Sequence, residues 1–236
     1  MRTSGDEKEK DRMITLEGDQ LVIRFPEVHE DAVLTISFQR TLRLPDDGVD
    51  YPLPPGLGGL PLRHLDDYAD KLPKSWRRRG GVIILMHQSE ALWIHFSSPG
   101  WRRQAYPFAV KVAAGKINAV TGKRWSKALH REPQDYLVVP KQPWLDGFCV
   151  AKGVIRQLVA MPLGEGFTAE EQLTEKAEWG GIQLLVYPLR AELWRPVPQL
   201  AFGLEAMVRC SVRDFGLAPG GRMRQEIYAD DRNLED

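Results

Sequence analysis

The stretch VLTISFQRTLRL at residues 33–44 decides the fold class, because apolar and polar side chains alternate along most of its length. Leu34, Ile36 and Phe38 fall on one side of an extended chain, and the polar residues between them fall on the other. A period of two residues is typical of a β-strand that packs one face against a core and turns the other away from it. The stretch therefore predicts a strand with one buried face.

Short strands separated by turn residues are predicted on both sides of this stretch. One hairpin is predicted over residues 14–25 with Gly18-Asp19 at its turn, and two more over 81–97 and 108–125. The other predicted strands cover 136–139, 148–161, 182–187 and 206–212, with a possible edge strand over 224–228. The pattern favours a mainly β fold, an antiparallel sandwich or barrel with one or two short helices, and α+β is the alternative.

Two short helices are predicted between these strands. Residues 62–72 carry apolar side chains at helical spacing and are closed by Pro73. A second helix is predicted to begin at Thr168, because Thr168 and Glu171 fit a capping box. The segment 45–61 contains five prolines and four glycines, which predicts an ordered loop packed on the domain.

The domain organisation follows from where the core-forming residues begin. Residues 1–12 contain no core-forming residue except the initiating Met, so they are predicted to be a disordered N-terminal arm. The rest, 13–236, is predicted to be a single β-rich domain, and two subdomains over 13–131 and 132–236 are the alternative.

The charge of the chain is unevenly distributed, although its formal net charge is zero. Residues 74–131 contain twelve Lys or Arg and one acid, Glu90, which is a net charge of +11. Residues 1–73 and 132–236 carry net charges of −6 and −5. Such asymmetry indicates an anionic ligand or partner, unless the acidic parts of the same chain neutralise the basic block within the fold.

The basic block contains three clusters, and a Trp adjoins each of them. We predict a binding surface made of Trp76, Arg77, Arg78, Arg79, Trp101, Arg102, Arg103, Lys123, Arg124 and Trp125. Cations that follow phosphates beside aromatic rings suit single-stranded nucleic acid. Nucleic acid is a possible partner but is not favoured, because dedicated nucleic-acid domains are usually far more basic than a chain of pI 7.0.

Two other functions remain open from the sequence. Polar residues inside apolar strands predict an alternative pocket of a hydrolase-like enzyme for small molecules, formed by Asp146, Arg156, Gln157 and Gln183. A protein–protein scaffold is the third reading, with Trp76, Trp101 and Trp125 as interface anchors. Whether the chain is an enzyme is left undecided.

Metal, cofactor and membrane functions have little support in the sequence. His87 and His95 would be neighbours across a hairpin but form an incomplete metal set, so no metal or cofactor is predicted. Cys149 and Cys210 lie between apolar residues, which predicts core packing. The longest apolar run, Val82 to Met86, is too short to span a membrane, and a cytoplasmic location is expected.

Several segments occur together that resemble a family of uncharacterised soluble proteins. These segments are PDDGVDYPLPPGLG (45–58), QPWLDG (142–147), VAMPLGEG (159–166), GGIQ (180–183) and APGGRMRQEIY (218–228). The resemblance covers most of the chain after residue 12, and it implies no activity, cofactor or catalytic residue.

Overall fold

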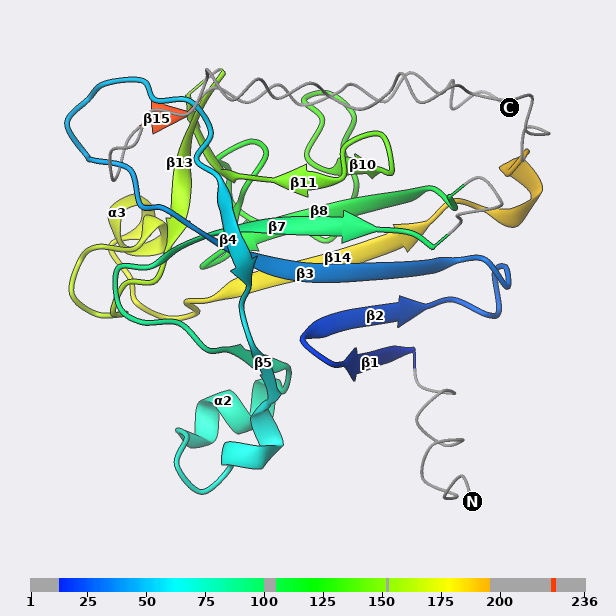
Figure 1. Cartoon of the computed structure of the whole chain (residues 1–236), viewed down its shortest axis with the longest axis horizontal. Coiled ribbons are helices and arrows are strands. Elements are labelled where there is room, and N and C mark those ends of the chain that lie inside the picture. Colours follow the sequence, from blue (N-terminus) through cyan, green and yellow to red (C-terminus); the bar gives the residue numbers. More distant parts are fainter. Residues whose placement is uncertain (1–12, 100–104, 152, 196–221, 224–236) are drawn as a thin grey trace.

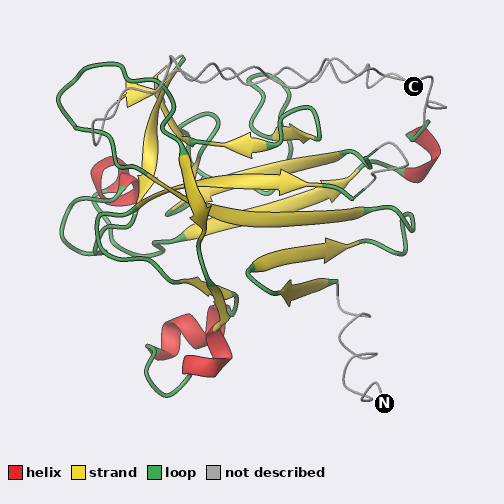
Figure 2. Cartoon of the chain, in the orientation of Figure 1, coloured by secondary structure: helices red, strands yellow, loops and turns green. Residues whose placement is uncertain are grey.

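Strands dominate the computed structural model of the chain, which describes residues 13–99, 105–151, 153–195 and 222–223 (Figure 1). The described structure has 40% strand and 11% helix, and its sheets are antiparallel. Figure 2 shows the few helices at the periphery of the strands. The predicted mainly β class is confirmed.

The larger sheet has nine strands within the described residues and runs in the order β1-β2-β3-β7-β13-β12. In addition, β4 pairs with β3, β11 pairs with β7, and β15 pairs with β13. Its strands are β1 (Ile14–Glu17), β2 (Gln20–Arg24), β3 (Val33–Thr41), β4 (Gly56–Gly59), β7 (Ala91–Ser97), β11 (Trp144–Leu145), β12 (Gly147–Ala151), β13 (Val154–Val159) and β15 (Arg222–Met223).

The smaller sheet has the order β10-β8-β14, and β9 also pairs with β8. A separate two-stranded sheet joins β5 to β6. These strands are β5 (Leu62–His64), β6 (Val82–Ile84), β8 (Phe108–Ala114), β9 (Ile117–Asn118), β10 (Leu137–Val139) and β14 (Ile182–Pro188).

The core lies between the two larger sheets. Leu34 and Ile36 of β3 are fully buried, as the alternation at 33–44 predicts, and they belong to one apolar cluster with Phe108 and Val110 of β8. This cluster also takes Leu145 from β11 and other side chains from several further strands. Strands from before and after residue 131 share both sheets, so the described parts of the chain are built around a common core.

Two α-helices and two short 3-10 helices complete the described structure. They are η1 (Leu65–Tyr68), α2 (Lys74–Arg79), α3 (Ala169–Thr174) and η2 (Ala191–Leu193). The predicted helix start at Thr168 is confirmed, because Thr168 and Glu171 form a capping box. The hydrogen bond from Thr168 and the backbone N–H groups of Gly166, Thr168 and Gly164 lower the pKa of Glu171 to about 2.

The predicted hairpin over 14–25 is confirmed, and so is the turn near Gly115 between β8 and β9. The predicted helix over 62–72 is wrong, because Leu62 begins a strand that pairs with β6 and only a single 3-10 turn follows it. The predicted hairpin over 81–97 is also wrong. Instead, β7 pairs along its whole length with β3, and β6 pairs with β5.

Three predicted elements lie outside the described residues: the arm over 1–12, the strand over 206–212 and the edge strand over 224–228. None of the described helices has the length and apolar character needed to cross a membrane.

Candidate anion-binding surface

The first predicted cluster lies on α2, at the end of the β5–β6 sheet (Figure 1). All its residues are exposed, and Trp76 is 44% exposed. The third cluster, Lys123 to Trp125, follows β9, and its Lys123 and Arg124 are also exposed. The second predicted cluster, Trp101, Arg102 and Arg103, lies outside the described residues.

A series of cation–π contacts connects α2 to Trp125. The Cζ atom of Arg79 lies 4.7 Å from the ring centroid of Trp179, and the Nζ atom of Lys116 lies 5.0 Å from the same centroid. Lys116 Nζ is also 5.6 Å from the ring centroid of Trp125, and Lys111 Nζ is 5.5 Å from it. We call Arg79, Trp179, Lys116, Trp125 and Lys111 the cation–aromatic ladder.

Hydrogen bonds from the backbone hold the middle of the ladder in place. Lys116 occupies the β8–β9 turn with a φ of 63°, and its backbone N–H donates to Oε1 of Gln183 at 2.7 Å. Trp125 N donates to the carbonyl of Lys116 at 2.9 Å. At the other end, the Arg79 guanidinium donates to the carbonyl oxygens of Glu178 and Trp179 at 2.9 and 3.1 Å. The ladder is therefore a fixed part of the fold.

A buried carboxylate accepts hydrogen bonds from the backbone around Trp179 of the ladder. Glu170 is 2% exposed, and its oxygens accept the backbone N–H groups of Glu178, Trp179 and Gly180 at distances of 2.7–3.1 Å. A Cβ added to Gly115 would lie 2.5 Å from the Cβ of Glu170, so only glycine allows this close approach. The hydrogen bonds from the backbone of residues 178–180 to Glu170 therefore fix the position of Trp179.

Lys111 connects the inner end of the ladder to a second buried carboxylate. Its side chain is fully buried, and its Nζ donates to Oδ2 of Asp135 at 2.7 Å. The same oxygen contacts Nδ1 of His130 at 2.7 Å, and Oδ1 of Asp135 accepts the His130 backbone N–H. Burial opposes ionisation of Asp135, but the hydrogen bonds from Lys111 and His130 outweigh burial and lower its pKa.

The exposed and partly exposed cations of this region have no acidic partner among the described residues. We define the basic surface as Lys74, Arg77, Arg78, Arg79, Lys116, Lys123 and Arg124. Within the described parts of the chain, none of these seven residues forms an ion pair. Arg79 and Lys116 contact neutral rings and carbonyl groups instead, which leaves their positive charge in place.

The four residues of the alternative pocket do not all converge, although Asp146 directly precedes Gly147, the cross-strand partner of Gln157. Gln157 is buried, and it bonds the backbone of Leu42 and Leu44. Arg156 is the next residue along β13 and therefore faces the other way, where it is exposed and pairs with Asp46 at 3.4 Å. Gln183 belongs to β14 in the smaller sheet, where it braces Lys116. The polar side chains inside these strands therefore fix loops in place.

Asp146 differs from the other three in having a carboxyl group that is largely withdrawn from water. It lies between β11 and β12, and its Oδ2 is buried without a hydrogen-bond partner in the described structure. This burial raises the pKa of Asp146 to about 7. The carboxyl therefore keeps its proton in the folded protein at pH values where it would ionise in the unfolded chain.

Replacement of Asp146 by Asn is expected to stabilise the protein above pH 7 by about 1–3 kcal/mol and to have little effect near pH 4. Between pH 3.8 and about 7 the folded state binds a proton that the unfolded state has lost, so stability falls as pH rises through this window. Urea unfolding at pH 5 and pH 8 measures the difference, with the exposed Asp67→Asn as the control. An equal change at both pH values would contradict the assignment.

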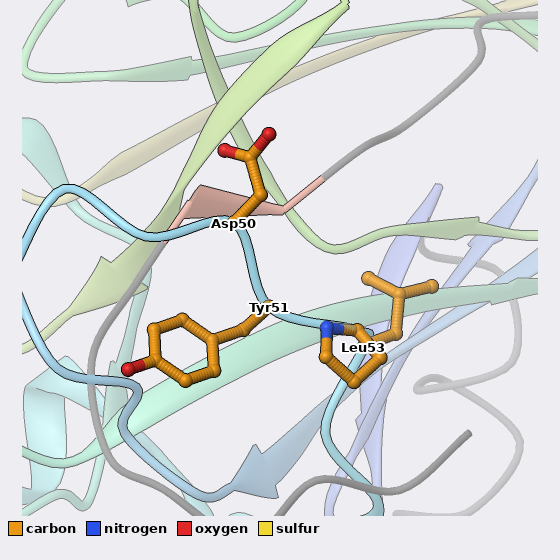
Figure 3. Close-up of a pocket in the computed structure, with 4 residues that line it drawn as sticks. Asp50, Tyr51 and Leu53 are labelled. Carbon is orange, nitrogen blue, oxygen red and sulfur yellow. The ribbon is translucent and has the colours of Figure 1, made fainter. Parts of the chain in front are cut away.

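The other titratable groups of the described residues, and the depression at residues 50–53, show little sign of a functional site. The His87–His95 hairpin is absent, and no group of three or more His, Cys, Asp or Glu in the described residues is placed to hold a metal ion. Cys149 is half-buried, and burial raises the pKa of its thiol, which disfavours the reactive thiolate. A depression of about 320 Å³ is lined by Asp50, Tyr51, Pro52 and Leu53. Figure 3 shows the side chains of this loop. These four residues are consecutive in one loop, and they bring no second polar group from another element.

The predicted binding surface includes Arg79 and Trp125 of the ladder, but it lacks Trp179, Lys116 and Lys111. Trp179 lies 100 residues after Arg79, next to an acidic residue, and no pattern in the sequence relates the two. Lys116 is an isolated Lys in a turn. Comparison with protein families, with curated proteins and with solved structures finds no match to this chain, so the contacts described above are the basis for assigning a function.

Proposed function

We propose that this protein binds a linear polyanion on the basic surface and that it acts by binding rather than by catalysis. The observation that carries the proposal is the cation–aromatic ladder, which ties α2 and the segment 123–125 together. Two clusters of charge that are far apart in the sequence thereby lie on one connected structure.

The ladder lowers the entropic cost of binding. An exposed Arg or Lys loses about 0.5–1.5 kcal/mol of rotamer freedom when a ligand immobilises it. Arg79 and Lys116 are already held against indole rings before any ligand arrives. Each such contact contributes about 0.5–1 kcal/mol at an exposed site, and it leaves the charge available to an anion.

A polymer suits this surface better than a single small anion. The cations come from three separate elements, namely α2, the β8–β9 turn and the segment after β9. Successive ladder contacts are 4.7–5.6 Å long, so Arg79 and the Lys123–Arg124 pair are several such contacts apart. One phosphate or carboxylate cannot reach all of them, whereas a chain of anionic groups can.

The rival functions have weaker support. A catalytic pocket would need Asp146, Arg156, Gln157 and Gln183 to converge. Instead, Gln157, Gln183 and Arg156 each interact with a different segment of the chain. An interface for an apolar protein partner would use Trp125 as an anchor, but this ring is already in contact with two lysines. We place the protein in the cytoplasm as part of this proposal, because it has only two cysteines.

The test is fluorescence anisotropy with end-labelled inorganic polyphosphate at several salt concentrations. Affinity is expected to fall steeply with salt, because bound counterions are released. Arg77→Ser/Arg78→Ser and Lys123→Ser/Arg124→Ser are each expected to weaken binding about tenfold or more and to reduce the log–log salt slope by about 1–2. All four side chains are exposed and form no hydrogen bond, ion pair or cation–π contact within the described residues, so these variants should fold.

The matched control is Arg43→Ser/Arg190→Ser, which removes the same charge from exposed sites outside the basic surface. If this control weakens binding as much as the test variants do, attraction is a matter of net charge and the proposed surface is wrong. Absence of binding by the unmodified protein at low salt would reject the proposal outright.

A further inference from the structure

The two indole rings of the cation–aromatic ladder are already engaged by cations. Trp125 carries Lys111 and Lys116 over its ring, and Trp179 carries Lys116 and Arg79. Lys111 is fully buried, so that contact cannot open to admit a ligand without disrupting the core. A base that stacked on either ring would have to compete with these contacts.

From this we infer that the polyanion is a phosphate chain recognised through its charges, with no contribution from stacked bases. The inference rests on the proposed function and specifies its ligand. Proteins that bind single strands usually offer open aromatic faces on which successive bases stack. Here the aromatic residues hold cations in position, and the cations meet the phosphates.

The composition of the surface favours phosphate over an acidic peptide. Protein–protein interfaces obtain most of their energy from apolar or aromatic anchors that become desolvated. The basic surface consists of Arg and Lys, and its ladder indoles are occupied. Arg77, Arg78 and Arg124 each present a planar fork that can donate two hydrogen bonds to one phosphate group.

Trp76 is the exception that makes the inference testable. It is 44% exposed, and its ring has no aromatic or cation contact within the described structure. Any stacking of a base on the basic surface should therefore occur there. Trp76→Ala removes this ring from the same helix that carries the arginines, while leaving their charge unchanged.

The experiment compares single-stranded oligonucleotides of equal length and charge: oligo-dT, oligo-dA and an abasic deoxyribose–phosphate chain. Inorganic polyphosphate and poly-glutamate of matched charge are the further probes. We expect the three oligonucleotides to bind within about threefold of one another, because one stacked base alone contributes about 1–3 kcal/mol, at least about fivefold in affinity. Trp76→Ala should leave the ratio between oligo-dT and the abasic chain unchanged.

The probes separate the possible results. Binding of base-bearing oligonucleotides more than about fivefold tighter than the abasic chain overturns the inference but leaves the proposed function standing. Poly-glutamate binding as tightly as the phosphate chains overturns the assignment to phosphate in the same way. Comparison of the abasic chain with inorganic polyphosphate shows which source of phosphate the surface prefers, and tight binding of either supports the inference. If no probe binds, both proposals fail together.

Discussion

Replacement of Asp135 by Ala is expected to lower the free energy of unfolding by about 3–5 kcal/mol, because it leaves a buried ammonium group without its counter-charge. The Lys111 side chain is fully buried, and Oδ2 of Asp135 is its acidic partner at 2.7 Å. Its other hydrogen-bond partners in the described structure are the neutral oxygens of Ser126 and Ala128. Neutral oxygens cannot replace the charge that stabilises a buried cation.

Urea unfolding measures this loss, and Asp67→Ala, which removes an exposed carboxylate, is the control. The double variant Asp135→Ala/Lys111→Met separates the cause, since it removes both buried charges. It should recover much of the lost stability, because replacing a buried ion pair by apolar groups is often close to neutral. If the double variant is no more stable than Asp135→Ala, the unpaired charge is not the origin of the loss.

Replacement of Glu170 by Ala is expected to destabilise the protein by about 3–5 kcal/mol. The change leaves three backbone N–H groups, those of residues 178–180, without their acceptor. Each buried donor that loses its partner costs about 1–3 kcal/mol, and partial access to water reduces the total. Glu170→Gln keeps one carbonyl oxygen and should lose about half as much stability.

The Glu170 variants also connect stability to binding. Trp179 is held through its backbone by Glu170, and its ring holds Arg79 and Lys116. Glu170→Ala should therefore weaken binding of polyphosphate, measured well below the melting temperature of the variant. Gln172→Ala, at an exposed position two residues further along α3, is the matched control. Unchanged unfolding energy in Glu170→Ala would show that residues 178–180 find other acceptors.

Local sequence signals predicted the parts of the fold that depend on neighbouring residues. The hairpin of β1 and β2 and the capping box of α3 both arise from contacts within a few residues, so turn chemistry and spacing reveal them. The helix predicted over 62–72 failed because residues 62–64 pair with a strand further along the chain, and spacing within the segment does not reveal that pairing. Leu62 is fully buried against the core, and its partner strand begins 20 residues later at Val82.

Local sequence signals are even less informative about the candidate site. Charge counting pointed to α2 and to residues 123–125, because excess charge is visible in any sequence. It could not identify Lys116 and Trp179 as the connection between them, since that connection depends on β14 pairing with β8. The sequence marks the polar residues of the alternative pocket as unusual, because most of them interrupt apolar strands. Gln157 and Gln183 accept hydrogen bonds from the backbone of loops, and only the structure reveals these partners.

The long separation of the ladder residues has a consequence for synthesis of the protein. Arg79 leaves the ribosome 100 residues before Trp179, the ring that holds it. During most of translation Arg79 therefore lacks the ring contact that positions it in the folded protein. The complete basic surface can form only after β14, which begins at Ile182, has joined β8. The affinity for polyanions that we propose for this surface is therefore expected to arise only late in synthesis.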